Sequence, residues 1–288
     1  MRGLAHGLGR LGWLHELPVT PTRQKQTATD KSGTEDRFAD ALDRMVDEGT
    51  PRLERTWPSM LSTGAVAGAE VSIGVLALLT VEAATHGNPL LGGLAFSFGF
   101  VALLLGHSEL FTEGFLVPIA VVAVKRATWR QLVRFWVGIL VSNLAGGWVL
   151  TWFAMRAYPE LHAQAVSSAS YFIDTGIGLR SFSMAVLGGS AITLMTRMHN
   201  GTDSVPARLV ASIMAAFVLA GLRLGHSVLD SLLIFSALHN GSAPFGYLDW
   251  LGWFGWAVLG NVVGGIGLVT LLRLVRSKDV ILERRAEV

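Results

Sequence analysis

The sequence has 288 residues, of which 51% are hydrophobic and only 15% are charged, and its mean hydropathy is +0.48. This composition excludes an ordinary soluble domain and is typical of a membrane protein. The net charge is +2, and the basic residues flank the apolar stretches, a distribution that orients a membrane protein and does not suggest a nucleic-acid partner. The absence of cysteine excludes disulfides, thiol nucleophiles and thiolate metal sites.

Residues 1–60 are predicted to form a separate N-terminal segment. It has no continuous apolar core before Met60, so we expect no cleavable signal peptide. The polar stretch 20–33 has no periodicity and is expected to be a linker. After it, apolar residues follow the spacing of one helix face, which predicts an amphipathic helix that docks at the membrane. The stripe consists of Phe38, Ala41, Leu42, Met45 and Val46.

Six hydrophobic spans are predicted in the pore domain 61–275, and a short tail covers 276–288. Spans two and five are longer than the roughly 20 residues that a helix needs to cross a bilayer. The fold class we expect is an all-α membrane protein whose second and fifth helices are broken. The spans are Leu61–Thr85, Leu90–Val124, Leu132–Met155, Ser181–Met198, Val205–Leu238 and Tyr247–Val275.

Each long span contains a short polar patch, at Gly106–Thr112 and at Gly225–Ser231. An ionisable group inside a bilayer costs at least about 2.5–3.5 kcal/mol, so such groups usually mark a pathway or relay. Non-helical backbone at this depth is tolerated only where it faces protein or a water-filled cavity. The patches therefore indicate a channel or transporter with two broken helices around a midplane site.

The distribution of positive charge predicts the orientation of the spans. With six spans, twenty of the 23 Lys and Arg residues fall on the side of the two termini. Arg156 and Arg180 fall on the other side, and Arg223 lies within span five. Positive residues are retained in the cytoplasm, so both termini are expected there.

Two pairs of motifs indicate an internal duplication. His107 and His226 lie 119 positions apart, and the similar sequences that begin at Asn143 and Asn261 lie 118 positions apart. These offsets divide the domain into halves of three spans each, about 61–155 and 181–275. An odd number of spans inverts the second half, so the halves are expected to be related by a pseudo-two-fold axis in the membrane plane.

Four short segments carry a resemblance to a known family: Phe96–Gly99, Glu109–Thr112, Gly225–Ser227 and Gly260–Gly265. Together they resemble the formate/nitrite transporter family over all six spans. The resemblance implies an aquaporin-like inverted repeat and a homopentamer with one pore in each protomer. It also implies passage of small monovalent anions through the cell (inner) membrane, with no enzymatic activity and no cofactor.

The resemblance also implies roles for individual residues. The pore centre would be formed by His226, by Thr112 as its hydrogen-bond partner, and by Asn261. Constrictions would be formed by Phe96 and Phe100 on span two, by Leu219 on span five, and by Leu110 and Phe111 in a movable loop of the first break.

The sequence departs from the family pattern around this centre. Gly225 stands where the family has an acidic residue, Asp230 replaces an asparagine, and Gly189 replaces a polar partner of the histidine. His107 and Ser108 stand where the first break usually has small residues. The substrate is therefore the feature that the resemblance defines least.

The remaining charged residues allow more than one interpretation. Glu109 is expected to accept backbone N–H bonds at the start of a half-helix, where negative charge is favourable. Arg223 and Asp230 lie seven positions apart, so one would neutralise the other or Glu109. The alternative is that Arg223 binds an anion in the pore. Glu70 is expected to be a partner between helices, and His107 has a structural and a functional interpretation.

Two other classes of function stay open. An aquaporin-like fold would also suit a channel for a small neutral solute. An intramembrane metalloenzyme would have enough ligands of the right kind in His107, His226, Glu109 and Asp230, although no metal-binding motif of the His-Glu-x-x-His type is present. Proton coupling and the gating trigger are also open, with the N-terminal helix and the first break as candidates.

Overall fold

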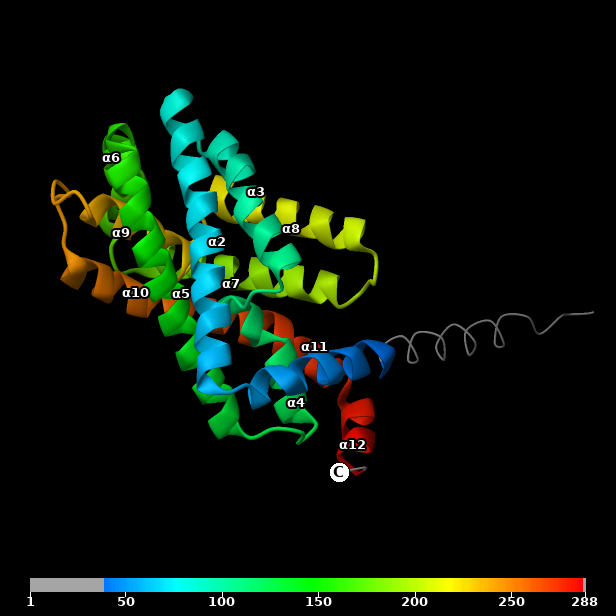
Figure 1. Cartoon of the computed structure of the whole chain (residues 1–288). Coiled ribbons are helices and arrows are strands. Elements are labelled where there is room, and N and C mark those ends of the chain that lie inside the picture. Colours follow the sequence, from blue (N-terminus) through cyan, green and yellow to red (C-terminus); the bar gives the residue numbers. More distant parts are fainter. Residues whose placement is uncertain (1–38, 287–288) are drawn as a thin grey trace, which may run out of the picture. The chain divides into compact units, whose positions relative to one another are not determined.

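The computed structural model describes residues 39–286, and these residues form helices and no strand (Figure 1). A first helix covers 39–54 and is followed directly by the membrane domain. Phe38 and the expected linker 20–33 lie outside the described residues.

The first half of the domain contains two long helices and one broken helix. α2 covers Trp57–Ala84 and α5 covers Trp129–Ala157. Between them, α3 (Pro89–Gly106) ends at a break that is followed by the short helices η1 (Phe111–Phe115) and α4 (Val117–Ala123). Local sequence fixes these boundaries: the side chain of Asn88 caps the start of α3, and Thr128 and Gln131 form a capping box at α5.

The second half repeats this order. α7 covers Leu179–His199, and α8 (Val205–Gly221) is separated by a break from α9 (Leu229–Leu238). The last span is continuous through α10 (Tyr247–Val262), the π-helical η3 (Val263–Thr270) and α11 (Leu271–Arg276).

These elements give the six predicted crossing segments. Among the described residues, four helices are long and apolar enough to span a membrane alone: α2, α3, α5 and the continuous Tyr247–Arg276. α8, α9 and the η1–α4 pair are shorter apolar helices. The predicted spans two and five are therefore α3 with η1–α4 and α8 with α9, each broken as expected, and span four is α7.

Close approach of the first and third helices holds each half together. A side chain at Gly68 of α2 would lie 2.0 Å from the carbonyl oxygen of Asn143 in α5. A side chain at Gly264 of η3 would lie 1.9 Å from the carbonyl oxygen of Val186 in α7. Only glycine permits these approaches, and small residues at crossings are how helices pack closely in lipid. In Figure 1, α2, α3 and α5 run together, and α7, α8 and α10 cross them as a second group.

The structure also contains helices that the sequence analysis missed. The connection between spans three and four, for which no helix was predicted, contains η2 (Pro159–Leu161) and α6 (His162–Thr175). The tail forms α12 (Lys278–Ala286), and α2 begins at Trp57, inside the segment predicted to end at residue 60. The buried residues of α6 follow helical spacing, which was a readable signal. They are Ala165, Ser168, Ala169 and Phe172.

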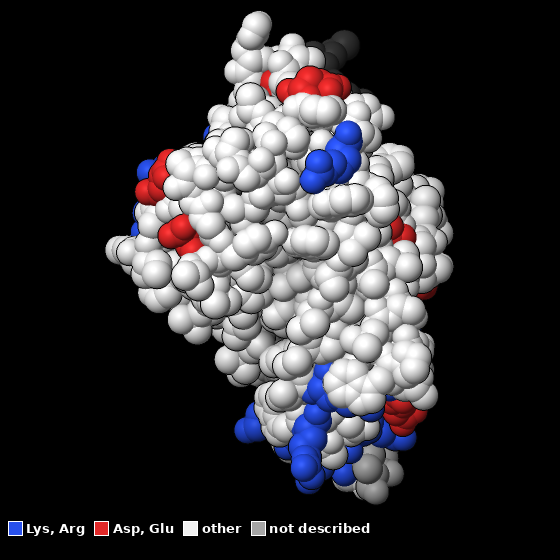
Figure 2. Space-filling view, turned by 60° about the vertical axis from the view of Figure 1, so that its left-hand side comes forward, with Lys and Arg blue, Asp and Glu red and all other residues white. Residues whose placement is uncertain are grey.

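The helix 39–54 docks through the predicted apolar stripe. Leu42 and Met45 are buried in a cluster with Leu116, Val117, Ala120, Val124 and Ile281, which come from the first break, α4 and α12. We call the side of the domain on which this cluster lies the terminal side, and the side of α6 and the end of α2 the far side. Lys and Arg gather at the terminal side, and a broad uncharged surface lies beyond them (Figure 2).

Candidate functional site

The two breaks begin with the same backbone geometry. Directly after α3, His107 has φ of +52°, and two residues after the end of α8, Arg223 has φ of +51°. In both, the backbone N–H of the next residue donates to the carbonyl five positions before it, over 3.2 Å and 2.9 Å. A left-handed residue that closes a helix with this bond is usually glycine. Here a histidine and an arginine adopt a conformation that is uncommon for residues with side chains.

One amide side chain from the third helix of the first half holds the first break. Asn143 in α5 is fully buried. Its Oδ1 accepts the N–H of Phe111 at 2.9 Å, and its Nδ2 donates to the carbonyls of Glu109 at 2.9 Å and Gly64 at 2.8 Å. Backbone groups at membrane depth must find a partner in the protein. Asn143 therefore supplies the bonds that the unwound segment lost.

Asn261 does the same for the second break. Its Oδ1 accepts the N–H of Ser227 at 2.9 Å, and its Nδ2 donates to the carbonyl of Gly225 at 2.8 Å. Ser227 corresponds to Phe111 and Gly225 to Glu109, and in each pair the second residue lies 116 positions after the first. By this register, His226 is the counterpart of Leu110.

The duplication is therefore real, but the predicted pairing of the two histidines is wrong. His107 is the counterpart of Arg223, since both close the helix before a break. The likeness of the segments Gly-His-Ser at 106–108 and 225–227 is a coincidence of sequence, shifted by three positions from the structural register. The centre of the domain has one histidine, and the inverted repeat places an apolar residue opposite it.

His226 lies where the two breaks meet. It is fully buried, and its Nε2 lies 2.8 Å from Oγ1 of Thr112 in η1. Its Nδ1 accepts the backbone N–H of Leu229 at 3.0 Å. In a neutral imidazole one nitrogen donates and the other accepts. Because Nδ1 accepts, the ring proton resides on Nε2 and Thr112 accepts it.

Asp230 fixes the backbone of the histidine. Its Oδ2 accepts the N–H of His226 at 2.7 Å, while its Oδ1 is buried and has no hydrogen-bond partner among the described residues. Asp230 does not pair with Arg223. The break in the helix removes the shared face that their seven-residue spacing would give in a continuous helix.

The predicted constriction residues are buried in the apolar core of the domain. Phe96 and Phe100 of α3 are buried and meet edge to face at 5.1 Å between ring centroids. Leu219 of α8 and the first-break residues Leu110 and Phe111 belong to the same buried apolar cluster. All five predicted constriction residues therefore lie in one core, on the elements that adjoin the two breaks.

A cavity of about 440 Å³ opens on the terminal side of the first break. His107, which is exposed, lines it together with Glu109. The carboxylate of Glu109 is only 3% exposed and pairs with Arg55 at 2.9 Å and Arg52 at 3.3 Å, both from the start of the chain. The expectation that Glu109 accepts backbone N–H bonds is therefore wrong, because two arginines outside the spans reach it. Glu70 lies against the other end of this segment, with its Oε1 close to Gly106.

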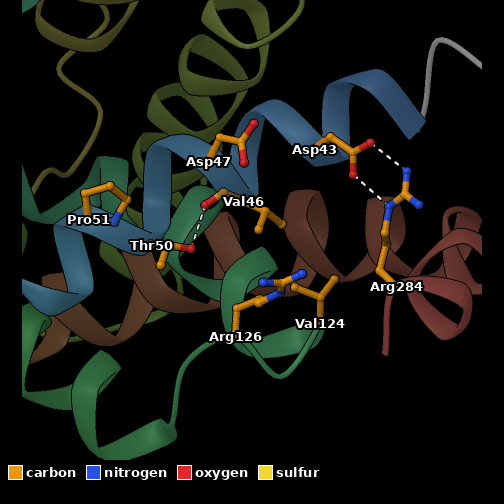
Figure 3. A pocket seen from close by; sticks show the side chains of 8 residues that line it. All are labelled: Asp43, Val46, Asp47, Thr50, Pro51, Val124, Arg126 and Arg284. Atoms are coloured by element: carbon orange, nitrogen blue, oxygen red, sulfur yellow. Dashed lines mark hydrogen bonds and ion pairs between the residues drawn. The ribbon is translucent and has the colours of Figure 1, made fainter. Parts of the chain in front are cut away.

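A second cavity, of about 530 Å³, lies where the helix 39–54 docks (Figure 3). It is bounded by Asp43 and Thr50 of that helix, by Arg126 after α4, and by Arg284 of α12. Arg284 pairs with Asp43 at 2.7 Å. This cavity contains residues of the docking contact and none of the predicted site residues.

On the far side, Arg223 pairs with Glu82 at the end of α2, with 3.5 Å between Nη2 and Oε1. Glu82 also accepts from Ser168 and Gln164 of α6. The sequence analysis paired Arg223 with other carboxylates and named none of these partners. The position of Glu82, a carboxylate near the end of an apolar span, could have identified it as a partner for Arg223. Nothing in the local sequence pattern indicates that Ser168 and Gln164 of α6 also bind Glu82.

The four residues that the metalloenzyme interpretation requires as ligands do not form a metal site. Among the described residues, no three His, Cys, Asp or Glu side chains are grouped so that they could hold a metal ion. Of its four supposed ligands, Glu109 is paired with arginines and His107 faces the terminal-side cavity. The breaks that looked alike in sequence bring these side chains to different places.

Comparison with known proteins agrees with this architecture. A solved structure described as an FNT family ion channel superposes with a TM-score of 0.68 at 18% identity, over 81% of this chain and 96% of that chain. A structure described as a pentameric formate channel with formate bound gives a TM-score of 0.62 at 20% identity, over 76% of this chain and 96% of that chain. Both are similar to this chain in fold.

Sequence relatives cover most of the chain. Inner membrane protein YfdC of Escherichia coli K12 is 24% identical over 277 residues, which is 92% of this chain and 87% of that protein. Formate channel FocA of Haemophilus influenzae is 27% identical over 194 residues, 63% of this chain and 66% of FocA. The sequence profile described as formate/nitrite transporter matches residues 39–275. On this match, together with the broken-helix fold, the chain belongs to the formate/nitrite transporter family and is a membrane transport protein.

Proposed function

We propose that this protein is a channel or transporter for small monovalent anions such as formate or nitrite. The observation that carries the proposal is the contact between His226 and Thr112 across the two breaks, inside an apolar core. Relatives named as formate channels cover much of the chain, which supports this substrate class.

The assembly and orientation belong to the same proposal. A structural neighbour described as pentameric supports a homopentamer with one pore in each protomer. The exposed apolar side chains of α3, Leu94, Phe98 and Leu105, would then face lipid or a neighbouring protomer. We place the terminal side in the cytoplasm and the protein in the inner membrane, because twenty of the 23 Lys and Arg residues lie on the side of the two termini.

An anion cannot pass a dry apolar constriction without a compensating contact. Moving an isolated carboxylate into a medium of low dielectric costs tens of kcal/mol by Born solvation. A donor at the narrowest point offsets part of this cost, and an imidazole can supply either a hydrogen bond or a proton. Both roles are compatible with the family fold.

The hydrogen bonds of His226 favour donation of a hydrogen bond. Nδ1 is occupied by the N–H of Leu229, so a second ring proton would displace that bond and leave a buried N–H unpaired. The neutral ring donates through Nε2 to Thr112. The hydroxyl hydrogen of Thr112 is then directed away from the ring and can donate a hydrogen bond to the anion.

Uptake of labelled formate and nitrite into proteoliposomes at pH 5–8 tests the proposal. His226→Phe removes the donor and is expected to reduce uptake at least tenfold, since one charge-assisted hydrogen bond is worth about 1.5–3 kcal/mol. His226→Gln keeps a neutral N–H donor, so it is expected to retain most of the uptake. His162→Phe, outside the breaks, is the control. Unchanged, still pH-dependent uptake by His226→Phe would contradict the proposal.

A neutral-solute channel is the second candidate. The observation that favours it is Gly225, which stands before the central histidine where the family resemblance implies an acidic residue. Swelling of liposomes in an isosmotic neutral solute such as urea, compared with anion uptake by the same preparation, separates the two functions. Swelling without anion uptake would favour the neutral-solute channel.

A further inference from the structure

Glu82 is held in one position from three directions on the far side of the domain. It is 2% exposed. Its Oε2 accepts from Oγ of Ser168 at 2.6 Å and from Nε2 of Gln164 at 2.8 Å, both on α6. On the other side its stem lies against Gly92 of α3, where a side chain would come within 2.6 Å of Cγ. The carboxylate is therefore fixed, with Oε1 left for Arg223.

Arg223 is held more loosely than its partner. Its guanidinium lies 4.9 Å from the ring centroid of Tyr171 and 3.5 Å from Glu82. A charge-assisted N–H···O bond is normally about 2.7–2.9 Å long. The side chain of Arg223 is 25% exposed, compared with 3% for Glu82. The guanidinium thus has a stacking partner and a distant carboxylate, and its hydrogen-bond donors are only partly used.

The pair borders a small cavity that Asp230 also lines. Its volume is about 10 Å³, close to the minimum that one water molecule requires. The unpartnered Oδ1 of Asp230 belongs to the carboxyl group whose other oxygen holds the backbone of His226. One buried space therefore joins the arginine to the carboxyl group that positions the pore histidine.

We propose that Arg223 is the anion-recognition residue of the far-side entrance, and that an incoming anion replaces Glu82 as the partner of its guanidinium. The inference rests on the proposed function and adds a specificity-determining residue to it. Glu82, which α6 holds in place, is a positioning residue: it keeps the guanidinium beside the cavity when no anion is present.

The geometry of the guanidinium defines the class of anion. Its planar fork offers two parallel N–H groups to two oxygens of one group, as in arginine–carboxylate pairs. Formate and nitrite are planar and have two such oxygens, whereas a halide has no second acceptor. Arg223 therefore favours planar monoanions with two oxygens over spherical anions of the same charge.

Initial rates of labelled formate uptake by right-side-out membrane vesicles test the inference. Arg223→Gln is expected to raise the half-saturating formate concentration about tenfold. Arg223→Lys keeps the positive charge but not the planar fork. Its half-saturating formate concentration is expected to lie between those of the wild type and Arg223→Gln, and nitrite is expected to inhibit it less strongly, relative to chloride, than it inhibits the wild type. Glu82→Gln removes the competing carboxylate and is expected to lower the half-saturating concentration.

Arg156→Gln is the matched control, because Arg156 is also on the far side but stacks on Trp152, away from this cavity. It is expected to change half-saturation less than about twofold. A half-saturating concentration for Arg223→Gln within twofold of that of Arg156→Gln would overturn the inference while leaving the proposed function intact. Wild-type vesicles that take up neither formate nor nitrite would overturn both. If Arg223→Gln does not fold, Glu82→Gln decides: unchanged or raised half-saturation would contradict the inference.

Discussion

Replacement of Asn143 by alanine tests whether one amide holds the first break in shape. The variant loses the bonds to Phe111 N–H and to the carbonyls of Glu109 and Gly64. Gly64 lies inside α2, where its carbonyl also accepts an intrahelical bond. Two backbone groups of the buried break are therefore left unpaired. Each unsatisfied buried group costs about 1–3 kcal/mol, so the expected loss of stability is about 2–6 kcal/mol.

Thermal unfolding of the purified protein measures this loss. In chains of 150–250 residues a loss of 1 kcal/mol lowers Tm by about 2–4 °C, so Asn143→Ala is expected to melt at least about 4 °C below the wild type. Asn261→Ala should behave alike, since it loses the equivalent bonds to Ser227 and Gly225. Asn240→Ala is the control, because its exposed amide donates to the hydroxyl of Ser242 in the same loop and holds neither break.

Anion uptake by the same preparations measures the effect on function. Asn143→Asp keeps an acceptor for Phe111 N–H, but turns an oxygen instead of a donor towards the two carbonyls. The Asn143→Asp variant is therefore expected to be no more stable than Asn143→Ala, although aspartate has nearly the same size and shape as asparagine. A melting temperature of Asn143→Ala within 1 °C of the control, with normal uptake, would refute this account of the break.

Three further predictions follow from single contacts. Glu109→Gln removes two ion pairs to a buried carboxylate and is expected to cost about 1.5–3 kcal/mol, whereas Asp43→Asn at the more exposed pair with Arg284 should cost less than about 1 kcal/mol; equal shifts in Tm would contradict this. At His107, with φ of +52°, the glycine variant should be about 1 kcal/mol more stable than the alanine variant, and the opposite order would exclude backbone strain there. Burial, and then the charges of nearby basic groups, lower the pKa of His239 to about 4 from 6.5; the folded state therefore binds fewer protons than the unfolded state between these values, and stability falls as pH falls through this window. The Tm of His239→Gln should accordingly fall less than that of the wild type between pH 7 and 4.5, and parallel curves would contradict the assignment.

Local sequence determined the features that depend on short-range pattern. The hydropathy of the spans is set by the lipid around them, so their number and order could be read directly. The polar residues inside the long spans indicated both breaks, and Asn143 and Asn261 lie where the duplication placed them. The apolar stripe at Leu42 and Met45 likewise predicted a docking helix, because helical periodicity is a local property.

Only the tertiary structure decided which charged groups meet. Glu109 is bound by Arg52 and Arg55 more than fifty positions earlier, and Arg223 by Glu82; no spacing rule links such pairs. The register of the repeat was likewise established by hydrogen bonds. The offset of 119 positions between His107 and His226 differs by three from the structural offset of 116. The physical reason is that a break in a helix cancels the periodicity that relates neighbours along the chain. At a break, contacts across the fold determine where each side chain lies.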